Sequence, residues 1–136
     1  VMDASPSIGL LNLNAILASN DLLIPVLADF LSYHGLKILF ETLSTIEEDF
    51  SFVFENIFIF LNRYNDSHRI CRRSKKALGT HYEKYLLQTM IRQDTKIAEA
   101  TSQGTPIFLF APSSKGAADI DNLIDEIFEL KGAGRV

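Results

Sequence analysis

The chain has 136 residues, of which 47% are hydrophobic and 22% charged, with a formal net charge of −4. These proportions exclude a disordered or collagen-like chain and are typical of one globular domain. Its apolar runs are shorter than the ~20 residues of a membrane-spanning helix, and the lone Cys71 excludes an intramolecular disulfide. We therefore expect residues 1–136 to form a single domain in a reducing cytoplasm.

Strand-like and helix-like segments alternate along the chain. Val1–Asp3 resembles the end of a buried strand, so we expect the chain to be the C-terminal part of a longer domain. Further strands are predicted over residues 22–27, 52–61, 86–91 and 106–110, and helices over 10–19, 29–44, 67–85, 96–102 and 117–130. This order predicts an α/β fold: a mainly parallel sheet with helices on both faces.

Basic residues are concentrated in the middle of the sequence. Residues 63–100 carry nine bases against four acids, whereas residues 1–62 carry one base against eight acids. Six of the bases fall within fourteen residues: Arg63, Arg69, Arg72, Arg73, Lys75 and Lys76. Such a cluster indicates a phosphate-binding patch, although a solvated helix face has the same pattern.

Asp3 has the position of a magnesium-side carboxylate. In nucleotide-hydrolysing α/β proteins, an apolar strand ends in Asp, and a loop of small residues then begins a helix. Mg²⁺ retains most of its waters, so one carboxylate acting directly or through water is sufficient. The loop over residues 6–9 would then sense a γ-phosphate. An Asp that caps the next helix has the same local pattern.

A series of ordered motifs resembles the ParA-type partition ATPases of the MinD/ParA superfamily, over nearly the whole chain. The motifs are DASPSIGLL at 3–11, NA at 14–15, the run 18–25, IRQD at 91–94, AEA at 98–100, GTPI at 104–107 and APSSKGA at 111–117. The resemblance implies a P-loop NTPase-like fold, ATP and Mg²⁺ as cofactors, and an ATP-dependent homodimer. It also implies non-specific DNA binding, a centromere-binding ParB-like adaptor, and a cytoplasmic, nucleoid-associated protein that segregates plasmids or chromosomes.

The same resemblance assigns roles to individual residues. Asp3 takes the catalytic, magnesium-side position, while Asn62 and Pro112 lie near the adenine. The DNA contacts are assigned to Arg69, Arg72, Arg73 and Lys96, with the helical register of the three arginines left open. Ala4 and Ser5 stand where the family has Thr and Pro, so the switch geometry is expected to differ.

The motif Gly-x-x-x-x-Gly-Lys-[Ser/Thr], which holds the phosphates, does not occur in the sequence. We therefore expect the parent protein to hydrolyse ATP and this chain alone to be inactive. The alternative function is a noncatalytic DNA-binding or regulatory module that pairs with intact subunits. A third interpretation, an unrelated doubly wound domain that binds a small molecule, requires the motif matches to be accidental.

Three further expectations concern single features. The spacing of the histidines does not suggest a metal site. Arg92 is either functional or an ion-pair partner of Asp94 or Glu99, and Lys115–Gly116 is either an anion site or a plain helix start. The last helix has an acidic polar face, which anionic lipid would repel, so we expect it to pack on the sheet and the protein not to bind membranes.

Overall fold

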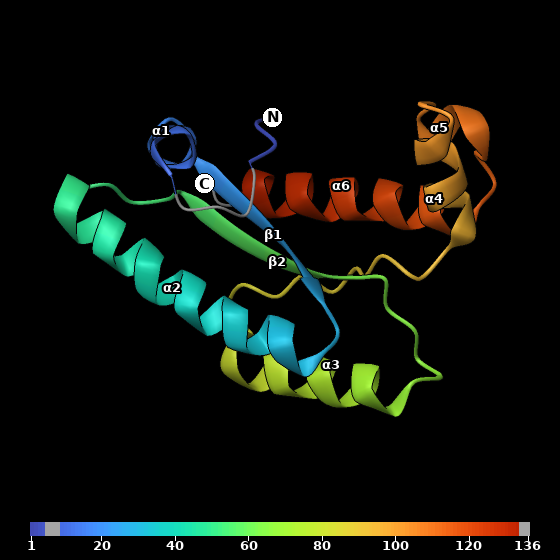
Figure 1. Cartoon of the computed structure of the whole chain (residues 1–136), viewed down its shortest axis with the longest axis horizontal. Coiled ribbons are helices and arrows are strands. Elements are labelled where there is room, and N and C mark those ends of the chain that lie inside the picture. Colours follow the sequence, from blue (N-terminus) through green and yellow to red (C-terminus); the bar gives the residue numbers. More distant parts are fainter. Residues whose placement is uncertain (5–8, 134–136) are drawn as a thin grey trace.

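The computed structural model describes residues 1–4 and 9–133 and shows helices on both sides of a small parallel sheet (Figure 1). The elements are α1 (Leu10–Leu17), β1 (Asp21–Leu27), α2 (Phe30–Phe50), β2 (Asn56–Asn62), α3 (Arg69–His81), α4 (Thr95–Ser102), α5 (Ile107–Phe110) and α6 (Lys115–Ala133). The expected α/β class is confirmed. Figure 1 shows α2 and α3 on one side of the strands and α6 on the other, with α4 and α5 beside the beginning of α6.

The sheet is built around β2. β1 pairs with it in parallel, from Asp21 opposite Asn56 to Leu27 opposite Asn62. On its other edge β2 bonds to residues 85–91: the Ile59 N–H donates to the Tyr85 carbonyl at 2.7 Å, and the Leu87 N–H donates to the Ile59 carbonyl at 2.8 Å. The strand predicted over 86–91 does not form a regular strand: the segment runs beside β2 and joins it through an isolated bridge between Ile59 and Leu86.

Alternate residues of β2 face two separate parts of the core. Ile59 and Leu61, at 0% and 1% exposure, lie in the cluster on the side of α2 and α3. Phe58 and Phe60 lie in a second cluster on the side of α6. The partners of that second cluster are Leu87, Ile91 and Leu123, with Ile97, Ile120 and Ile127 packed against it. Because successive strand residues point to opposite faces, β2 is buried on both. The expectation that the last helix packs on the sheet is confirmed.

Local capping sets the limits of the long helix α2. The Asp29 carboxylate accepts a hydrogen bond from the Ser32 N–H at 2.7 Å, which satisfies a free donor of the first turn. At the other end, Ser51 adopts a left-handed conformation with φ 49°, and its N–H donates to the Glu47 carbonyl. The helix therefore extends six residues beyond the predicted end at Ser44, because no breaker occurs before Ser51.

Three other predicted strands also differ from the structure. Val1–Asp3 is exposed and has no strand partner within the described residues. Residues 106–110 form the short helix α5 instead, because Pro106 suits a helix start and its carbonyl accepts bonds from the Leu109 and Phe110 N–H groups. The strand predicted over 52–61 begins only at Asn56. Short apolar runs fit a helix and a strand equally well, and their partners are distant in sequence.

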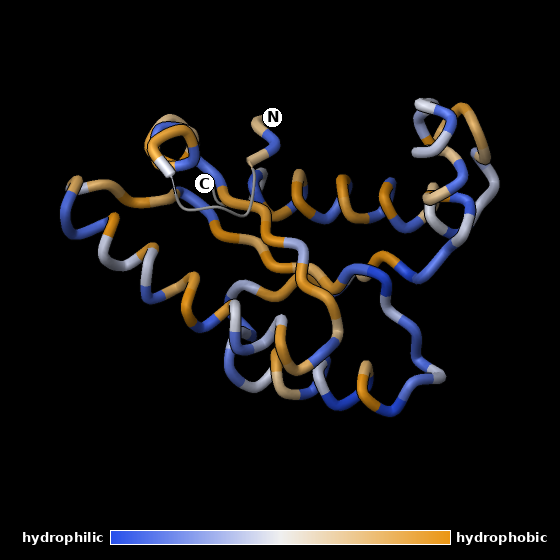
Figure 2. Tube along the Cα trace, in the orientation of Figure 1, coloured by the Kyte–Doolittle hydropathy of each residue, from blue (hydrophilic) through white to orange (hydrophobic). Residues whose placement is uncertain are grey.

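One face of β1 is left uncovered. Figure 2 shows both strands as largely hydrophobic, yet Leu23, Pro25 and Leu27 are exposed while Ile24 and Val26 between them are buried. An open hollow of about 1740 Å³ lies over this region, between α1, β1, α2 and the end of α6. None of the described helices has both the length and the apolarity needed to cross a membrane.

Candidate functional site

The carboxyl ends of β1 and β2 carry polar residues, as expected for a parallel α/β sheet. β1 leads to Asp29, the cap of α2, and β2 ends at the half-buried Asn62. The Asn62 side-chain oxygen accepts a hydrogen bond from the Arg63 N–H at 2.9 Å, and Arg63 is left-handed with φ 51°. The chain therefore turns sharply after Asn62, before Tyr64 returns to the core. Asn62 lies at the predicted strand end, and its amide nitrogen has no protein partner among the described residues.

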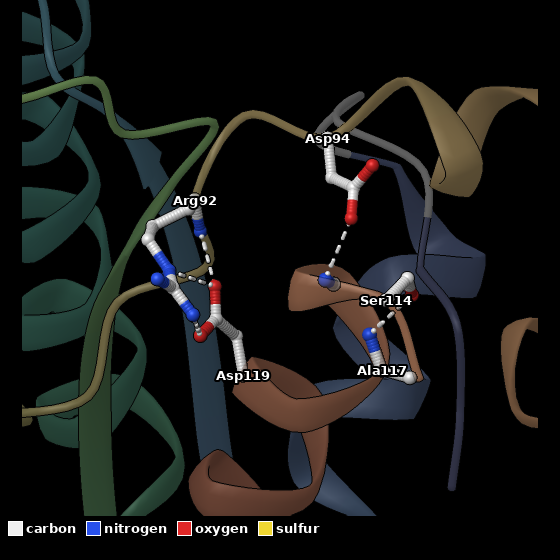
Figure 3. Close-up of polar contacts among 6 residues, drawn as sticks. Arg92, Asp94, Ser114, Ala117 and Asp119 are labelled. Carbon is white, nitrogen blue, oxygen red and sulfur yellow. Dashed lines mark hydrogen bonds and ion pairs between the residues drawn. The ribbon is translucent and has the colours of Figure 1, made fainter. Parts of the chain in front are cut away.

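Near the carboxyl end of the sheet, Arg92 forms a bidentate ion pair with Asp119 of α6 (Figure 3). The Asp119 carboxylate accepts bonds from Arg92 Nη2 at 2.7 Å, from Nε at 2.9 Å and from the backbone N–H at 2.9 Å. Burial alone would raise the pKa of Asp119, but the bonds from Arg92 outweigh it, so the pKa lies below its usual range. The same pair raises the pKa of Arg92. The ion-pair alternative for Arg92 is correct in kind, but the partner is Asp119 rather than Asp94 or Glu99.

Asp94 joins the beginnings of α4 and α6. Its carboxylate accepts bonds from the Lys96 N–H at 2.9 Å and from the Gly116 N–H at 2.8 Å, and both bonds lower its pKa. The Ser114 hydroxyl oxygen accepts from the Ala117 N–H at 3.1 Å (Figure 3). These side chains already occupy two of the free N–H groups at the start of α6. The plain helix start is therefore the better description of Lys115–Gly116.

The exposed side of α3 carries an uninterrupted set of cations, which we call the basic face. It consists of Arg69, Arg72, Arg73 and Lys76, all exposed. Their spacing of three, four and seven residues places them on one side of a helix. Cys71, Ser74 and Leu78 on the opposite side are buried. Within the described residues none of the four forms an ion pair, and Arg72 donates instead to the carbonyl oxygen of Asp66.

The structure brings together some of the predicted site residues and separates others. Arg69, Arg72 and Arg73 share the basic face, whereas Lys96 lies on α4, on the other side of the sheet (Figure 1), and pairs with Glu99 at 2.6 Å. Pro112 is exposed in the loop between α5 and α6. Lys96 is therefore not part of the basic face, and its charge is paired with that of Glu99.

Asp3 is exposed at the border of the hollow, whose lining includes Asp21 at the start of β1 and Lys131 near the end of α6. Asn62 and Pro112 do not line this hollow, so this chain does not bring Asp3 together with them. The loop expected to sense a γ-phosphate covers residues 6–9, of which 6–8 lie outside the described residues. Carboxylate oxygen suits Mg²⁺, but the described residues offer no group of three metal-ligating side chains. Asp3 is thus one ligand of the right chemistry, and the residues present do not by themselves form a complete Mg²⁺–ATP site.

Sequence reasoning missed the role of Asp119. This carboxylate is 6% exposed and lies one turn before Leu123, on the side of α6 that faces the core. An acid in register with an apolar stripe indicates a buried partner, and that signal was available. The sequence did not indicate which residue this partner is, because Arg92 lies 27 residues away.

Comparison with known proteins identifies the class of this fold. Residues 1–56 match a family model described as an AAA domain, which agrees with a P-loop NTPase-like α/β fold. The chain is 55% identical to the cell division protein PomZ of Myxococcus xanthus over 127 residues, covering 93% of the chain and 40% of PomZ. It is 26% identical to the chromosome-partitioning ATPase Soj of Treponema pallidum, covering 97% of the chain and 52% of that protein. It is also 26% identical to the chromosome partitioning protein ParA of Myxococcus xanthus, covering 85% of the chain and 41% of that ParA.

These matches confirm the resemblance on which the residue assignments rest: over most of its length the chain is similar to ParA-type partition ATPases. It spans about half or less of the length of these curated relatives.

Proposed function

We propose that the chain is part of a ParA-type ATPase that segregates plasmid or chromosomal DNA and that binds DNA without sequence preference through the basic face of α3. The basic face is the observation that carries this proposal. Four cations without a carboxylate partner repel one another, and Arg69 and Arg72 add positive charge at the positive end of the helix. A bound polyanion would relieve both the repulsion among the four cations and the unfavourable placement of Arg69 and Arg72 at the positive end of the helix.

The basic face acts by charge rather than by reading bases. Flexible arginine and lysine side chains on one helix side bind phosphates and release counterions, so the affinity depends steeply on salt and little on sequence. With four phosphates neutralised, the logarithm of the association constant should fall with the logarithm of salt concentration with a slope of about −3 to −4.

The nucleotide is proposed to bind at the carboxyl edge of the sheet. Asn62 and Pro112 would lie against the adenine. The remainder of the parent protein would have to bring Asp3 to this edge, where it would hold Mg²⁺ directly or through water. Bound Mg²⁺ would neutralise phosphate charge during hydrolysis. Because the sequence carries no phosphate-binding loop motif, we expect this chain alone not to hydrolyse ATP.

The proposed assembly is the one that the resemblance implies. Two subunits of the parent protein are proposed to dimerise when ATP is bound, so that their basic faces form one surface, and to release DNA after hydrolysis. A ParB-like centromere-binding adaptor would stimulate that step, in the cytoplasm and at the nucleoid. The name of PomZ refers to cell division, and this role is the second candidate for the parent protein, supported by its 55% identity.

The proposal is tested by reversing charge on α3. The variant Arg72→Glu/Arg73→Glu should lose most of its affinity for a labelled random duplex in fluorescence anisotropy and should show a shallower salt slope. The matched control, Lys37→Glu/Lys84→Glu, makes the same change in net charge at exposed cations outside α3. Equal binding by the wild type and the α3 variant would refute the basic face as the DNA contact.

Two further measurements separate the remaining alternatives. Lys96→Ala shows whether α4 adds a second DNA contact, since Lys96 lies apart from the basic face. Stoichiometric nucleotide binding by this chain alone would argue against the noncatalytic module that pairs with intact subunits. A chain that binds DNA and an intact relative, but no nucleotide, would support that module.

A further inference from the structure

Tyr64 stands between the carboxyl edge of the sheet and the basic helix. Its side chain is buried, with 8% of the residue exposed, directly after the left-handed turn at Arg63. The Tyr64 N–H donates to the Ile91 carbonyl at 2.9 Å, and the Tyr64 carbonyl accepts from the Gln93 N–H at 2.9 Å. Both backbone groups are thus bound to the segment beside β2, so the position of the ring is fixed by the sheet.

The first half of α3 rests on Tyr64 and the turn around it. Tyr64 and Cys71 belong to the same buried cluster, which anchors the inner side of the helix. The Lys75 ammonium lies 5.7 Å from the centroid of the Tyr64 ring, within the range of a cation–π contact. Arg72 is held in addition by the Asp66 carbonyl. The turn therefore contacts α3 through the Tyr64 ring and the Asp66 carbonyl, and Tyr64 also shares a buried cluster with the inner side of the helix.

Lys75 differs from the cations of the basic face. It lies to one side of that face, above the aromatic ring, while Arg69, Arg73 and Lys76 have no carboxylate partner in the described part of the chain. An aromatic ring attracts a cation without neutralising its charge. Tyr64 can therefore hold the helix through Lys75 and leave its positive potential intact, which an acidic residue could not do.

We propose that Tyr64 is a positioning residue for DNA binding: its ring holds Lys75 and so fixes the orientation in which the basic face of α3 meets phosphates. This inference rests on the proposed function. It adds that the segment after β2 orients the DNA-binding helix through Tyr64.

The test is a double-mutant cycle on DNA affinity, measured by anisotropy with the full chain. Tyr64→Leu should weaken binding by about two- to fivefold, the range of an exposed cation–π contact, and Tyr64→Phe should bind like the wild type. In the Lys75→Met background, Tyr64→Leu should have a clearly smaller effect. In the matched Lys76→Met background, which removes a cation that does not touch the ring, its effect should be the same as in the wild type.

The outcomes distinguish this inference from the proposed function. If Arg72→Glu/Arg73→Glu abolishes DNA binding but Tyr64→Leu has the same effect in all three backgrounds, Tyr64 is only structural and the inference is overturned. If neither set of variants alters binding, the basic face itself is wrong. Should Tyr64→Leu fail to fold, the side-chain methylene protons of Lys75 provide a second measurement. They should show an upfield ring-current shift in the wild type and in Tyr64→Phe, and its absence overturns the inference.

Discussion

The carboxylate of Asp119 is the most constrained acidic side chain at the carboxyl end of the sheet, because Arg92 supplies it with both side-chain and backbone donors. Its pKa in the folded protein lies below the usual value, despite a burial that by itself acts in the opposite direction. The pair therefore stabilises the fold fully above the ordinary carboxyl pKa of about 3.9. This stabilisation is lost as the pH falls through the lower, folded-state pKa.

We predict that Asp119→Asn lowers the free energy of unfolding at pH 7 by about 1–3 kcal/mol, since the Arg92 donors lose a charged acceptor. The deficit relative to the wild type should shrink as the pH falls below about 4, because the carboxylate is then protonated first in the unfolded chain and, at lower pH, also in the folded protein. Urea denaturation at pH 7 and at pH 3 measures both values. Asp121→Asn, an exposed neighbour on α6, serves as the control and should have little effect. A deficit that does not depend on pH would contradict the assigned ion pair.

Gly116 is required by packing at the start of α6. A Cβ at this position would lie 2.6 Å from Ile97 Cγ1 and 2.7 Å from Ile97 Cδ1. Gly116→Ala should therefore destabilise the fold by about 1–2 kcal/mol, although alanine is the better helix former. Gly132→Ala, in the same helix with nothing within 4 Å of its Cβ, should be neutral or stabilising in the same thermal melts. Replacing Ile97 by Ala should reduce the penalty of Gly116→Ala, and an unchanged penalty would count against this contact.

At the scale of single residues, the sequence predicts chemistry better than partners. The basic cluster could be found because its members are neighbours in the chain, and helical spacing then places three of the predicted arginines on one face. Lys96 could not be separated from them in advance, because only the folded arrangement places α4 away from the basic face. The partner of Arg92 was missed for the same reason, since Asp119 reaches it only through the folded arrangement of α6.

At the scale of elements, the long helix α2 shows that a capping residue in the sequence can specify where a helix begins. Asp29 begins α2 as a capping residue, with its carboxylate 2.7 Å from the Ser32 nitrogen. We predict that Asp29→Ala costs about 1 kcal/mol of stability, since it leaves a first-turn N–H without an acceptor, whereas Asn should retain most of the effect. Chemical denaturation of the wild type and the two variants measures this difference. Equal losses for Ala and Asn would show that the cap does not stabilise α2.

Elements without such local signals were predicted less well. Residues 86–91 pair with β2 through bonds that depend on the position of the whole sheet, so their strand character was weak in the sequence. Residues 106–110 are apolar enough for a strand, yet Pro106 and a bond from the Ala111 N–H to the Ile107 carbonyl close a helical turn instead. Apolar content indicates burial, but it does not distinguish the two backbone conformations over five residues.

At the scale of the molecule, the two faces of β2 are covered by helices, but β1 is not protected in the same way. Its outer edge has no strand partner within residues 1–4 and 9–133. Leu23, which lines the hollow, is 45% exposed, and Leu27 at the end of the strand is 41% exposed. Leu10 and Leu11 of α1, at 80% and 86% exposure, add to this apolar surface. An apolar edge strand with free backbone groups is a template for pairing with another chain. Pro25, which lacks an N–H donor, reduces this tendency without removing it.

We therefore predict that this chain, on its own, self-associates through β1 and the uncovered face beside it. Light scattering coupled to size-exclusion chromatography should give a mass above that of one chain, increasing with concentration. Leu23→Lys places a charge on the uncovered face and should shift the protein toward the monomer. Leu109→Lys, at a position that is 78% exposed on α5 and far from β1 in Figure 1, is the matched control and should leave the mass unchanged. If both substitutions have the same effect, association depends on general surface hydrophobicity rather than on the free edge of the sheet. A wild-type chain that is monomeric at all concentrations would refute the prediction.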